Sequence, residues 1–238
     1  ACFEDSYQGA AMAQFAIDNL GCKKAIIYGD STTDYSKGLS ASFKKQFEKL
    51  DGVIVDSENY VAGDTDFASV LTKIKNMDFD VLYIPGYYSE AGLIIKQARA
   101  MGITVPIIGG DGFDSVTLSD LAGNENLNDV YFTTAYTTIN ASDSLKAFID
   151  AYKEKYNEDP NMFSALAFDS VNCLIQGIEK AGSSDPAAIQ KAVSAIEFSG
   201  ITGSFTFDAA HTPVKSVLVV KLVNGVQSDA ASVSPKVD

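Results

Sequence analysis

Two hydrophobic patterns alternate along the chain up to about residue 135. Short continuous apolar runs are typical of strands buried on both faces of a parallel sheet, and apolar residues that recur every three or four positions indicate helices. The predicted strands cover 24–28, 80–85, 105–108 and 129–134, with a further strand that begins at 53–55. The predicted helices cover 8–20, 39–50, 67–74, 89–101 and 115–121. Strands that alternate with helices predict βαβ units with helices on both faces of the sheet.

The pattern changes after residue 137, where helices follow one another without an intervening strand. The predicted helices cover 142–156, 161–181 and 186–197, and the predicted strands that follow cover 203–207 and 216–223. Asp185-Pro186 is expected to cap the last of these helices. Asn224-Gly225 predicts a turn, and the small polar residues 228–238 predict a frayed tail.

The helix predicted over 161–181 is apolar nearly all round, which indicates a buried helix. Residues 137–199 contain no convincing strand against which it could be buried. We infer that this helix packs on a sheet whose strands are not in this chain. The alternative is a bundle in which it packs between its two helical neighbours.

Charge and cysteine content narrow the function classes. The net charge is −13 and Arg99 is the single arginine, which argues against a nucleic-acid partner because phosphate neutralisation needs clustered basic residues. No apolar stretch reaches the length that spans a bilayer. Cys2, Cys22 and Cys173 match no metal or redox spacing, and the last two are expected to be buried.

Catalytic chemistry is poorly represented. The single histidine, His211, lies in a turn sequence and is expected at the surface. No serine has a Gly-x-Ser-x-Gly context, and no Gly-x-Gly-x-x-Gly or Walker pattern is present. The sequence therefore predicts a protein that is not an enzyme and that uses no metal and no cofactor.

Polar residues that follow predicted strands suggest a binding cleft instead. Tyr87 and Asp111 come after consecutive apolar strands, at the strand ends where open parallel sheets bind small ligands. A carboxylate can bind an ammonium group, and a tyrosine offers a hydroxyl and a ring face. Tyr35, in the first strand–helix loop, would border the same cleft. Taken alone, Asp111 could simply form a turn, and Tyr87, like Tyr88, could be a packing aromatic.

Several motifs in register resemble the periplasmic branched-chain amino-acid binding proteins, which are the type I solute-binding proteins of ABC transporters. The resemblance covers essentially the whole chain. The motifs are Tyr28-Gly29-Asp30, Asp34-Tyr35-Ser36-Lys37-Gly38, Asp64-Thr65-Asp66-Phe67, Gly86-Tyr87-Tyr88-Ser89-Glu90, Gln97-Ala98-Arg99-Ala100-Met101-Gly102, Ile108-Gly109-Gly110-Asp111-Gly112 and Phe163-Ser164-Ala165-Leu166-Ala167-Phe168-Asp169.

The resemblance implies an α/β protein of the type I periplasmic-binding-protein fold that binds an aliphatic amino acid between two lobes. Tyr87 matches a tyrosine that contacts the ligand, Asp111 matches the acidic position that takes its ammonium group, and Tyr35 matches a tyrosine that lines the cleft. Phe163 lies near a first-lobe position that can touch the ligand side chain. The implied partner is an ABC permease, the implied location is periplasmic or extracellular, with a lipid anchor as one form, and the full-length protein is expected to be a monomer.

One departure concerns the first lobe, because family members carry a longer N-terminal segment that builds its sheet. We therefore expect an N-terminally truncated protein with one complete doubly wound lobe and a mainly helical remnant of the other. The complete lobe is predicted at 7–134 with 202–238, the remnant at 137–199, and the hinge segments near 1–7, 133–138 and 199–202.

Two alternatives remain at this point. The same fold serves as the ligand-sensing domain of receptors and regulators. A flavodoxin-like domain would need a phosphate-binding loop after the first strand, and the Ser/Thr-rich segment 29–33 keeps that interpretation open.

Overall fold

Two units make up the protein, and the chain passes between them three times. The computed structural model describes residues 1–234. Unit 1 contains Ala1–Glu4 and Ala135–Ser216, and unit 2 contains Asp5–Thr134 and the chain from Val217. The sequence placed 202–216 in the complete lobe, whereas the structure assigns these residues to unit 1. The last four residues of the predicted lobe, 235–238, lie outside the described part.

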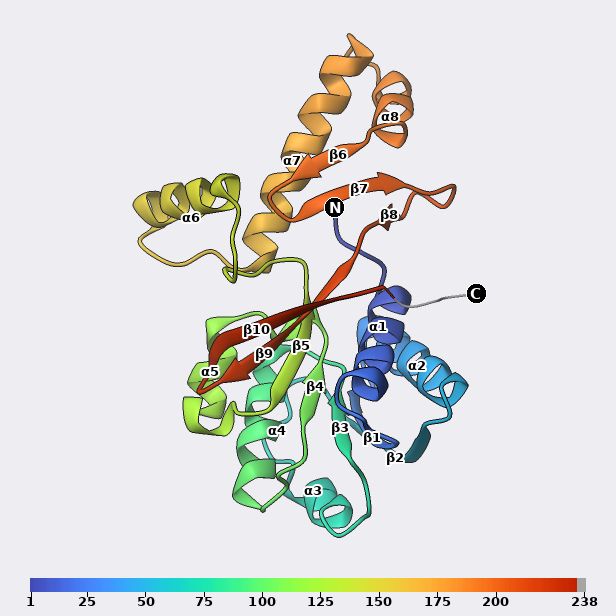
Figure 1. Cartoon of the computed structure of the whole chain (residues 1–238), viewed down its shortest axis with the longest axis vertical. Helices are drawn as coiled ribbons and strands as arrows, with labels where there is room; N and C mark the ends of the chain where they lie inside the picture. The colour runs from blue at the N-terminus through green and yellow to red at the C-terminus, as the bar shows by residue number, and fades with distance from the viewer. Residues whose placement is uncertain (235–238) are drawn as a thin grey trace. The chain divides into compact units, whose positions relative to one another are not determined.

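A seven-stranded sheet forms the centre of unit 2, in the order β10-β9-β5-β4-β3-β1-β2 (Figure 1). Strands β1 to β5 pair in parallel, and β9 and β10 form an antiparallel hairpin that pairs with β5. The strands are β1 (Lys24–Asp30), β2 (Val53–Tyr60), β3 (Val81–Ile84), β4 (Ile107–Gly109), β5 (Val130–Thr134), β9 (Val217–Val223) and β10 (Val226–Val233).

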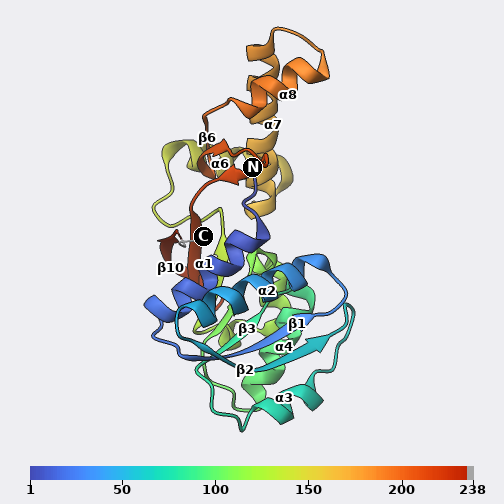
Figure 2. The same cartoon turned by 90° about the vertical axis from the view of Figure 1, so that its right-hand side faces the viewer.

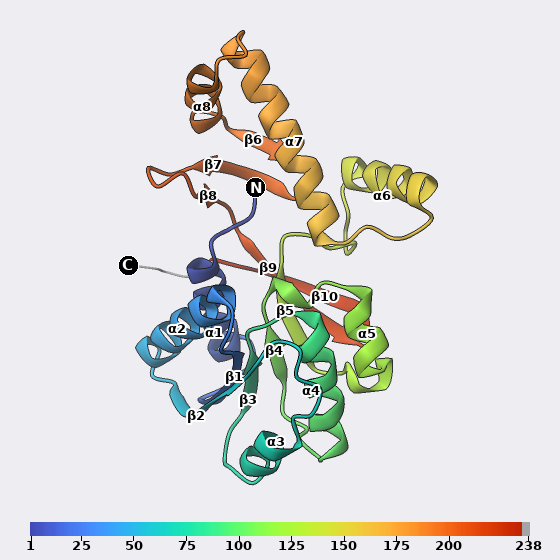
Figure 3. The same cartoon turned by 180° about the vertical axis from the view of Figure 1, so that it is seen from behind.

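Helices cover both faces of this sheet, as the sequence predicts. Figures 2 and 3 show α1 and α2 on one face and α3, α4 and α5 on the other. The helices are α1 (Asp5–Asp18), α2 (Asp34–Lys49), α3 (Ala68–Ile74), α4 (Tyr88–Ala100) and α5 (Val116–Ala122), with 3-10 turns η1 (Asp111–Phe113) and η2 (Asn124–Asn126). The doubly wound α/β architecture is confirmed.

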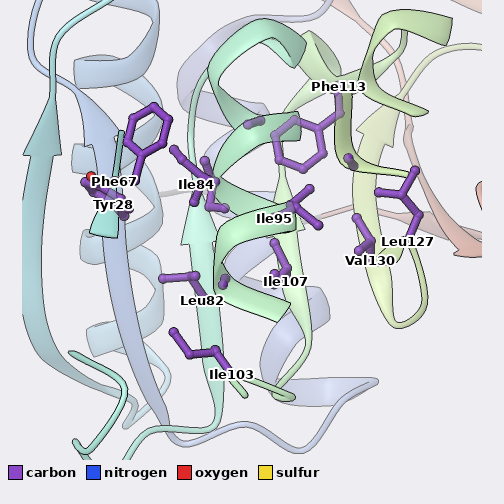
Figure 4. Close-up of a cluster of buried hydrophobic side chains, with 14 of the residues drawn as sticks. Tyr28, Phe67, Leu82, Ile84, Ile95, Ile103, Ile107, Phe113, Leu127 and Val130 are labelled. Atoms are coloured by element: carbon purple, nitrogen blue, oxygen red, sulfur yellow. The ribbon is translucent and has the colours of Figure 1, made fainter. Parts of the chain in front are cut away.

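Alternating side chains of the strands build a core on each face. Leu82, Ile107 and Val130 of three neighbouring strands belong to the same buried cluster as Ile95 of α4 (Figure 4). On the opposite face, the ring of Tyr83 stacks on Phe43 of α2 with centroids 4.1 Å apart. Because strands with both faces buried read as continuous apolar runs, this arrangement explains why the sequence located them.

One local prediction, the frayed tail, was wrong. Residues 228–233, part of the predicted frayed tail, belong to β10 (Val226–Val233), because main-chain pairing with β9 does not require apolar side chains. The pairing is irregular between Gln227 and Asp229. Helix α3 begins at Ala68, one residue after its predicted start, and the Asp66 carboxylate accepts the N–H of Ala68.

Two polar residues of α4 hold the connections around it. Gln97 accepts the N–H of Phe67 through Oε1 and donates to the Thr65 carbonyl through Nε2. The guanidinium of Arg99 donates to the carbonyls of Ile103, Val105 and Asn128. The side chains of Gln97 and Arg99 therefore stabilise the loops that surround α4.

Unit 1 combines three helices with a small antiparallel sheet in the order β6-β7-β8. Its apolar core is small and is centred on Cys173, Ile196, Phe198 and Phe205. The elements are α6 (Asp143–Tyr156), α7 (Met162–Ala181), α8 (Pro186–Ser194), β6 (Phe198–Gly200), β7 (Gly203–Phe207) and β8 (Pro213–Val214). Asp185 caps α8 and Pro186 opens it, as predicted.

Helix α7 exposes a broad apolar surface. Its buried side includes Met162, Ala165 and Cys173, whereas Val171 is 58% exposed. The exposed apolar residues of the helix are Phe163, Phe168, Val171, Leu174, Ile175 and Ile178. A helix whose solvent side is this apolar does not match the usual amphipathic pattern of a surface helix. Within residues 1–234, neither α6 nor α8 buries this surface, which disfavours the three-helix bundle.

A buried lysine joins three segments of unit 1. Lys215 donates to Thr202 Oγ1 at 3.0 Å and to the carbonyl of Ala1 at 3.3 Å. Thr202 Oγ1 in turn donates to the carboxylate of Asp169 on α7, which also accepts the N–H groups of Ile201 and Thr202. Burial lowers the pKa of Lys215 from its ordinary value of 10.5 to about 8.

The depressed pKa of Lys215 predicts a pH dependence of stability. Between about pH 8 and 10.5 the folded chain releases this proton while the unfolded chain keeps it, so stability rises with pH by up to about 1.4 kcal/mol per unit. Below pH 8 both states are protonated and this contribution is flat. We expect urea unfolding at pH 7.5, 9 and 10 to show this rise in the parent chain and to lose it in Lys215→Met.

Lys191→Met is the matched control, because Lys191 is exposed on α8. Its stability curve should follow that of the parent chain across the same pH range. Parallel curves for the parent chain and Lys215→Met would contradict the prediction.

Candidate ligand-binding site

Three loops of unit 2 meet at the carboxyl ends of three adjacent strands. Tyr35 lies in the first turn of α2 after β1, Tyr87 precedes α4 after β3, and Asp111 opens η1 after β4. Since β1, β3 and β4 are neighbours in the sheet, the parallel topology brings these loops to one edge. The sequence-based expectation that they lie together is consistent with this geometry.

A hydrogen bond joins Tyr35 to Asp111. The Tyr35 hydroxyl donates to Asp111 Oδ1 at 2.7 Å and accepts the N–H of Gly112 at 2.9 Å. Burial, together with the negative charge of Asp111, raises the pKa of Tyr35 well above its usual value. The phenol therefore stays protonated and acts as a donor to the carboxylate at physiological pH.

Tyr87 stacks on Tyr35 and remains open to solvent. The two ring centroids lie 4.8 Å apart with planes at 26°. The side chain of Tyr87 is 40% exposed, whereas Asp111 is buried. Burial, with smaller effects of Asp111 and Asp5, raises the pKa of Tyr87, so this hydroxyl also stays neutral. The result is an exposed aromatic face beside a buried carboxylate.

Gln8 of α1 holds the main chain of the Asp111 loop. Its Oε1 accepts the N–H of Asp111 at 2.7 Å and the hydroxyl of Thr133 at 2.5 Å. Gln8 is only 1% exposed, and Thr133 on β5 is fully buried. The loop is therefore fixed from two sides, by Gln8 through the backbone and by Tyr35 through the carboxylate.

Glycines make these contacts possible. A Cβ at Gly110 would lie 2.5 Å from the Tyr35 hydroxyl oxygen and 2.8 Å from Gln8 Oε1. One at Gly86 would lie 1.9 Å from the hydroxyl of Tyr60, under the loop that carries Tyr87. Real Cβ atoms do not approach neighbours this closely, so both loops depend on the absence of a side chain.

The structure brings three of the four predicted residues together. Phe163 belongs to unit 1, where it occupies the first turn of α7 and is 43% exposed. The ligand-binding roles of Tyr87, Asp111, Tyr35 and Phe163 stay predictions. Sequence reasoning missed Gln8 and Tyr60, and the only signal for Gln8 was a polar side chain on a helix face otherwise made of small and apolar residues.

Other chemistries find little support. Among residues 1–234, no three or more His, Cys, Asp or Glu side chains are grouped to hold a metal ion. Within the same residues, none of the helices combines the length and apolarity needed to cross a bilayer. His211 is exposed in a turn at φ 65°, as expected for a surface residue.

Comparison with known proteins identifies the family. The profile of the family described as "Periplasmic binding protein" matches residues 2–227. The chain belongs to the periplasmic binding protein family. Its type I fold and the resemblance to branched-chain amino-acid binding proteins are confirmed by the relatives described next.

Curated relatives include the leucine-, isoleucine-, valine-, threonine- and alanine-binding protein of Pseudomonas aeruginosa, which is 30% identical over 86% of this chain and 54% of its own length. The Leu/Ile/Val-binding protein of Escherichia coli K12 is 28% identical over the same shares. The chain thus spans about half the length of the curated relatives it matches.

One similar solved structure is the branched-chain amino acid substrate-binding protein LivJ of Streptococcus pneumoniae in complex with isoleucine. It is 41% identical, with a TM-score of 0.90 over 98% of this chain and 66% of that chain. A leucine-binding protein LivK from Thermotoga maritima is 38% identical, with a TM-score of 0.89 over 98% of this chain and 67% of that chain.

The packing at Gly110 generates a prediction about stability. Gly110→Ala should lower the free energy of unfolding of unit 2 by about 1–3 kcal/mol, because the methyl group overlaps the Tyr35 hydroxyl and Gln8. The φ of Gly110 is −89°, so backbone strain does not contribute. Urea unfolding measured by circular dichroism provides the test.

Gly38→Ala is the control. Gly38 lies on helix α2, and a Cβ there would meet only the Cβ of Asp5, at 3.9 Å. It should be neutral or slightly stabilising because alanine favours a helix over glycine. Equal stability of Gly110→Ala and the parent chain would show that the loop accommodates the methyl group.

Proposed function

We propose that this chain supplies the Asp111 side of an amino-acid site in the solute-binding protein of an ABC importer, with a branched-chain aliphatic amino acid as ligand. The observation that carries the proposal is the buried Asp111 carboxylate, held by Tyr35 beside the exposed ring of Tyr87. The names of the relatives, which are Leu/Ile/Val-binding proteins, supply the ligand class.

The chemistry of the three side chains fits an α-amino acid. A carboxylate forms a charge-assisted hydrogen bond to the α-ammonium group, and it is strongest where water is scarce. The Tyr35 hydroxyl is committed to Asp111 and Gly112, so its role is to orient the carboxylate. The exposed face of Tyr87 can pack on an aliphatic side chain.

We extend the proposal to the role of the full-length protein, with the family membership as support. The ligand-loaded full-length protein, a monomer outside the cytoplasm, delivers the amino acid to a permease and performs no chemistry on it. The relatives are named as binding proteins, which supports this view. Contacts to the ligand carboxylate are proposed to come from residues of the full-length protein beyond this chain.

Calorimetric titration with leucine, isoleucine and valine tests the proposal. We expect tight binding by the full-length gene product and weak or no binding by this chain alone. Asp111→Asn in the full-length protein should weaken binding by about 100-fold, because a buried ammonium group would lose its charged partner.

Asp114→Asn is the matched control. Asp114 is a neighbouring buried carboxylate that accepts the hydroxyl of Thr134 rather than that of Tyr35. Its affinity should stay near that of the parent protein. Retained affinity in Asp111→Asn would remove Asp111 from the site, and a full-length protein that binds none of the three amino acids would refute the proposed ligand class.

We also propose that unit 1 is part of a larger lobe, in which strands from outside this chain cover the exposed apolar face of α7. Six exposed apolar side chains on one helix support this proposal. The coverage of about half of the curated relatives' length agrees with it.

Val171→Asp tests the covering of α7. In this chain the substitution should change the free energy of unfolding by less than about 0.5 kcal/mol, since Val171 is largely exposed. In the full-length protein it should cost several kcal/mol, because it would bury an unpaired charge. Gln176→Asp, on the same helix and also exposed, adds the same charge as a control. A small effect of Val171→Asp in both chains would contradict the proposal.

A further inference from the structure

Gln8 of unit 2 belongs to none of the sequence motifs described above. It lies in the first turn of α1, shortly after the chain enters unit 2 at Asp5. Its partner Thr133 lies on β5 just before the chain leaves the unit after Thr134. One amide oxygen therefore joins the segment that follows the first crossing, the strand that precedes the second, and the Asp111 loop.

The contact with Asp111 is made through the backbone and leaves the carboxylate for other partners. Gln8 Oε1 accepts the Asp111 N–H at 2.7 Å, and the carboxylate of the same residue accepts the hydroxyl of Tyr35. These two bonds fix the two ends of the residue, its amide nitrogen and its side-chain oxygen. A shift of either end would re-aim the carboxylate.

Close packing makes the position of Gln8 specific. Gln8 is 1% exposed, and a Cβ on Gly110 would come within 2.8 Å of its Oε1. Gly9 is the next residue of α1. A Cβ there would lie 2.8 Å from the carbonyl oxygen of Leu39, so α1 packs closely against α2. The amide therefore has little freedom to move, and its hydrogen bond holds the Asp111 loop against α1.

We propose that Gln8 is a positioning residue that sets the affinity for the amino acid by aiming Asp111. This inference rests on the proposed function, because it assigns to Asp111 the ammonium group of the ligand. Gln8 itself makes no contact with the ligand. Its Oε1, which also accepts the Thr133 hydroxyl, instead holds the main-chain N–H of Asp111 where Tyr35 can orient the carboxylate.

A double-mutant cycle on the full-length gene product tests the proposal, with leucine affinity as the readout. Gln8→Met keeps the side-chain length but removes the acceptor, and it should weaken leucine binding about tenfold. In an Asp111→Asn background the same change should weaken binding less than twofold, because the group that Gln8 aims has already lost its charge. A purely structural role would give the same factor in both backgrounds.

A second measurement does not depend on the ligand. Hydrogen–deuterium exchange of the segment 107–114 should be faster in Gln8→Met than in the parent protein, since the Asp111 N–H loses its acceptor. Thr133→Val, which removes only the bond between Thr133 and Gln8, should speed exchange less and weaken leucine binding less. The exchange of α4, on the opposite face of the sheet, is the internal reference.

The outcomes separate this inference from the proposed function. If the parent full-length protein fails to bind leucine, isoleucine or valine, the proposed function fails, and faster exchange in Gln8→Met would then assign Gln8 to the loop alone and overturn its role in affinity. If the parent binds and Gln8→Met retains its affinity, or the two substitutions are additive, the proposed function stands and the positioning role of Gln8 is refuted.

Discussion

The site of unit 2 depends on one constraint, which is that the main chain at Gly110 approaches Tyr35 and Gln8 with no side chain between them. This approach lets a phenol reach the Asp111 carboxylate and an amide oxygen reach the Asp111 N–H. The sheet and its helices position the loops that make this approach. Parallel pairing of β1, β3 and β4 brings the loops to one edge, and helices on both faces hold the strands that carry them. A buried carboxylate held in this way is already oriented, which would reduce the cost of ordering it under the proposed function.

Much of the fold and of the site of unit 2 could be predicted from sequence, because the strands are buried on both faces and the helices have one apolar side. Apolar runs therefore located β1, β3, β4 and β5, and topology then placed Tyr35, Tyr87 and Asp111 at neighbouring strand ends. Gln8 could not be found in this way, since its importance comes from a contact with a residue more than a hundred positions away. Strand β10 was missed because its pairing is made by the backbone of polar residues, which leaves no periodic apolar signal.

Unit 1 shows a different relation between sequence and structure. Its helices were predicted from their caps and periodicity, yet the apolar residues of α7 exceed what the unit buries. Hydrogen bonds among Lys215, Thr202 and Asp169 stabilise this unit, whose apolar core is small. The type of each helix could thus be predicted locally, whereas the packing of α7 could not, because its six large apolar side chains stay exposed within residues 1–234. Its solvent-facing surface is consistent with a segment adapted to a larger lobe.

The irregular pairing between Gln227 and Asp229 has a consequence for how the protein behaves at high concentration. Strand β10 forms one edge of the seven-stranded sheet, and an uninterrupted edge offers unpaired N–H and C=O groups to other chains. A shift of register bends such an edge and breaks its regular spacing, while the charge of Asp229 opposes close approach of an identical strand. The irregular pairing and the charge together oppose edge-to-edge association of two copies of the chain along β10.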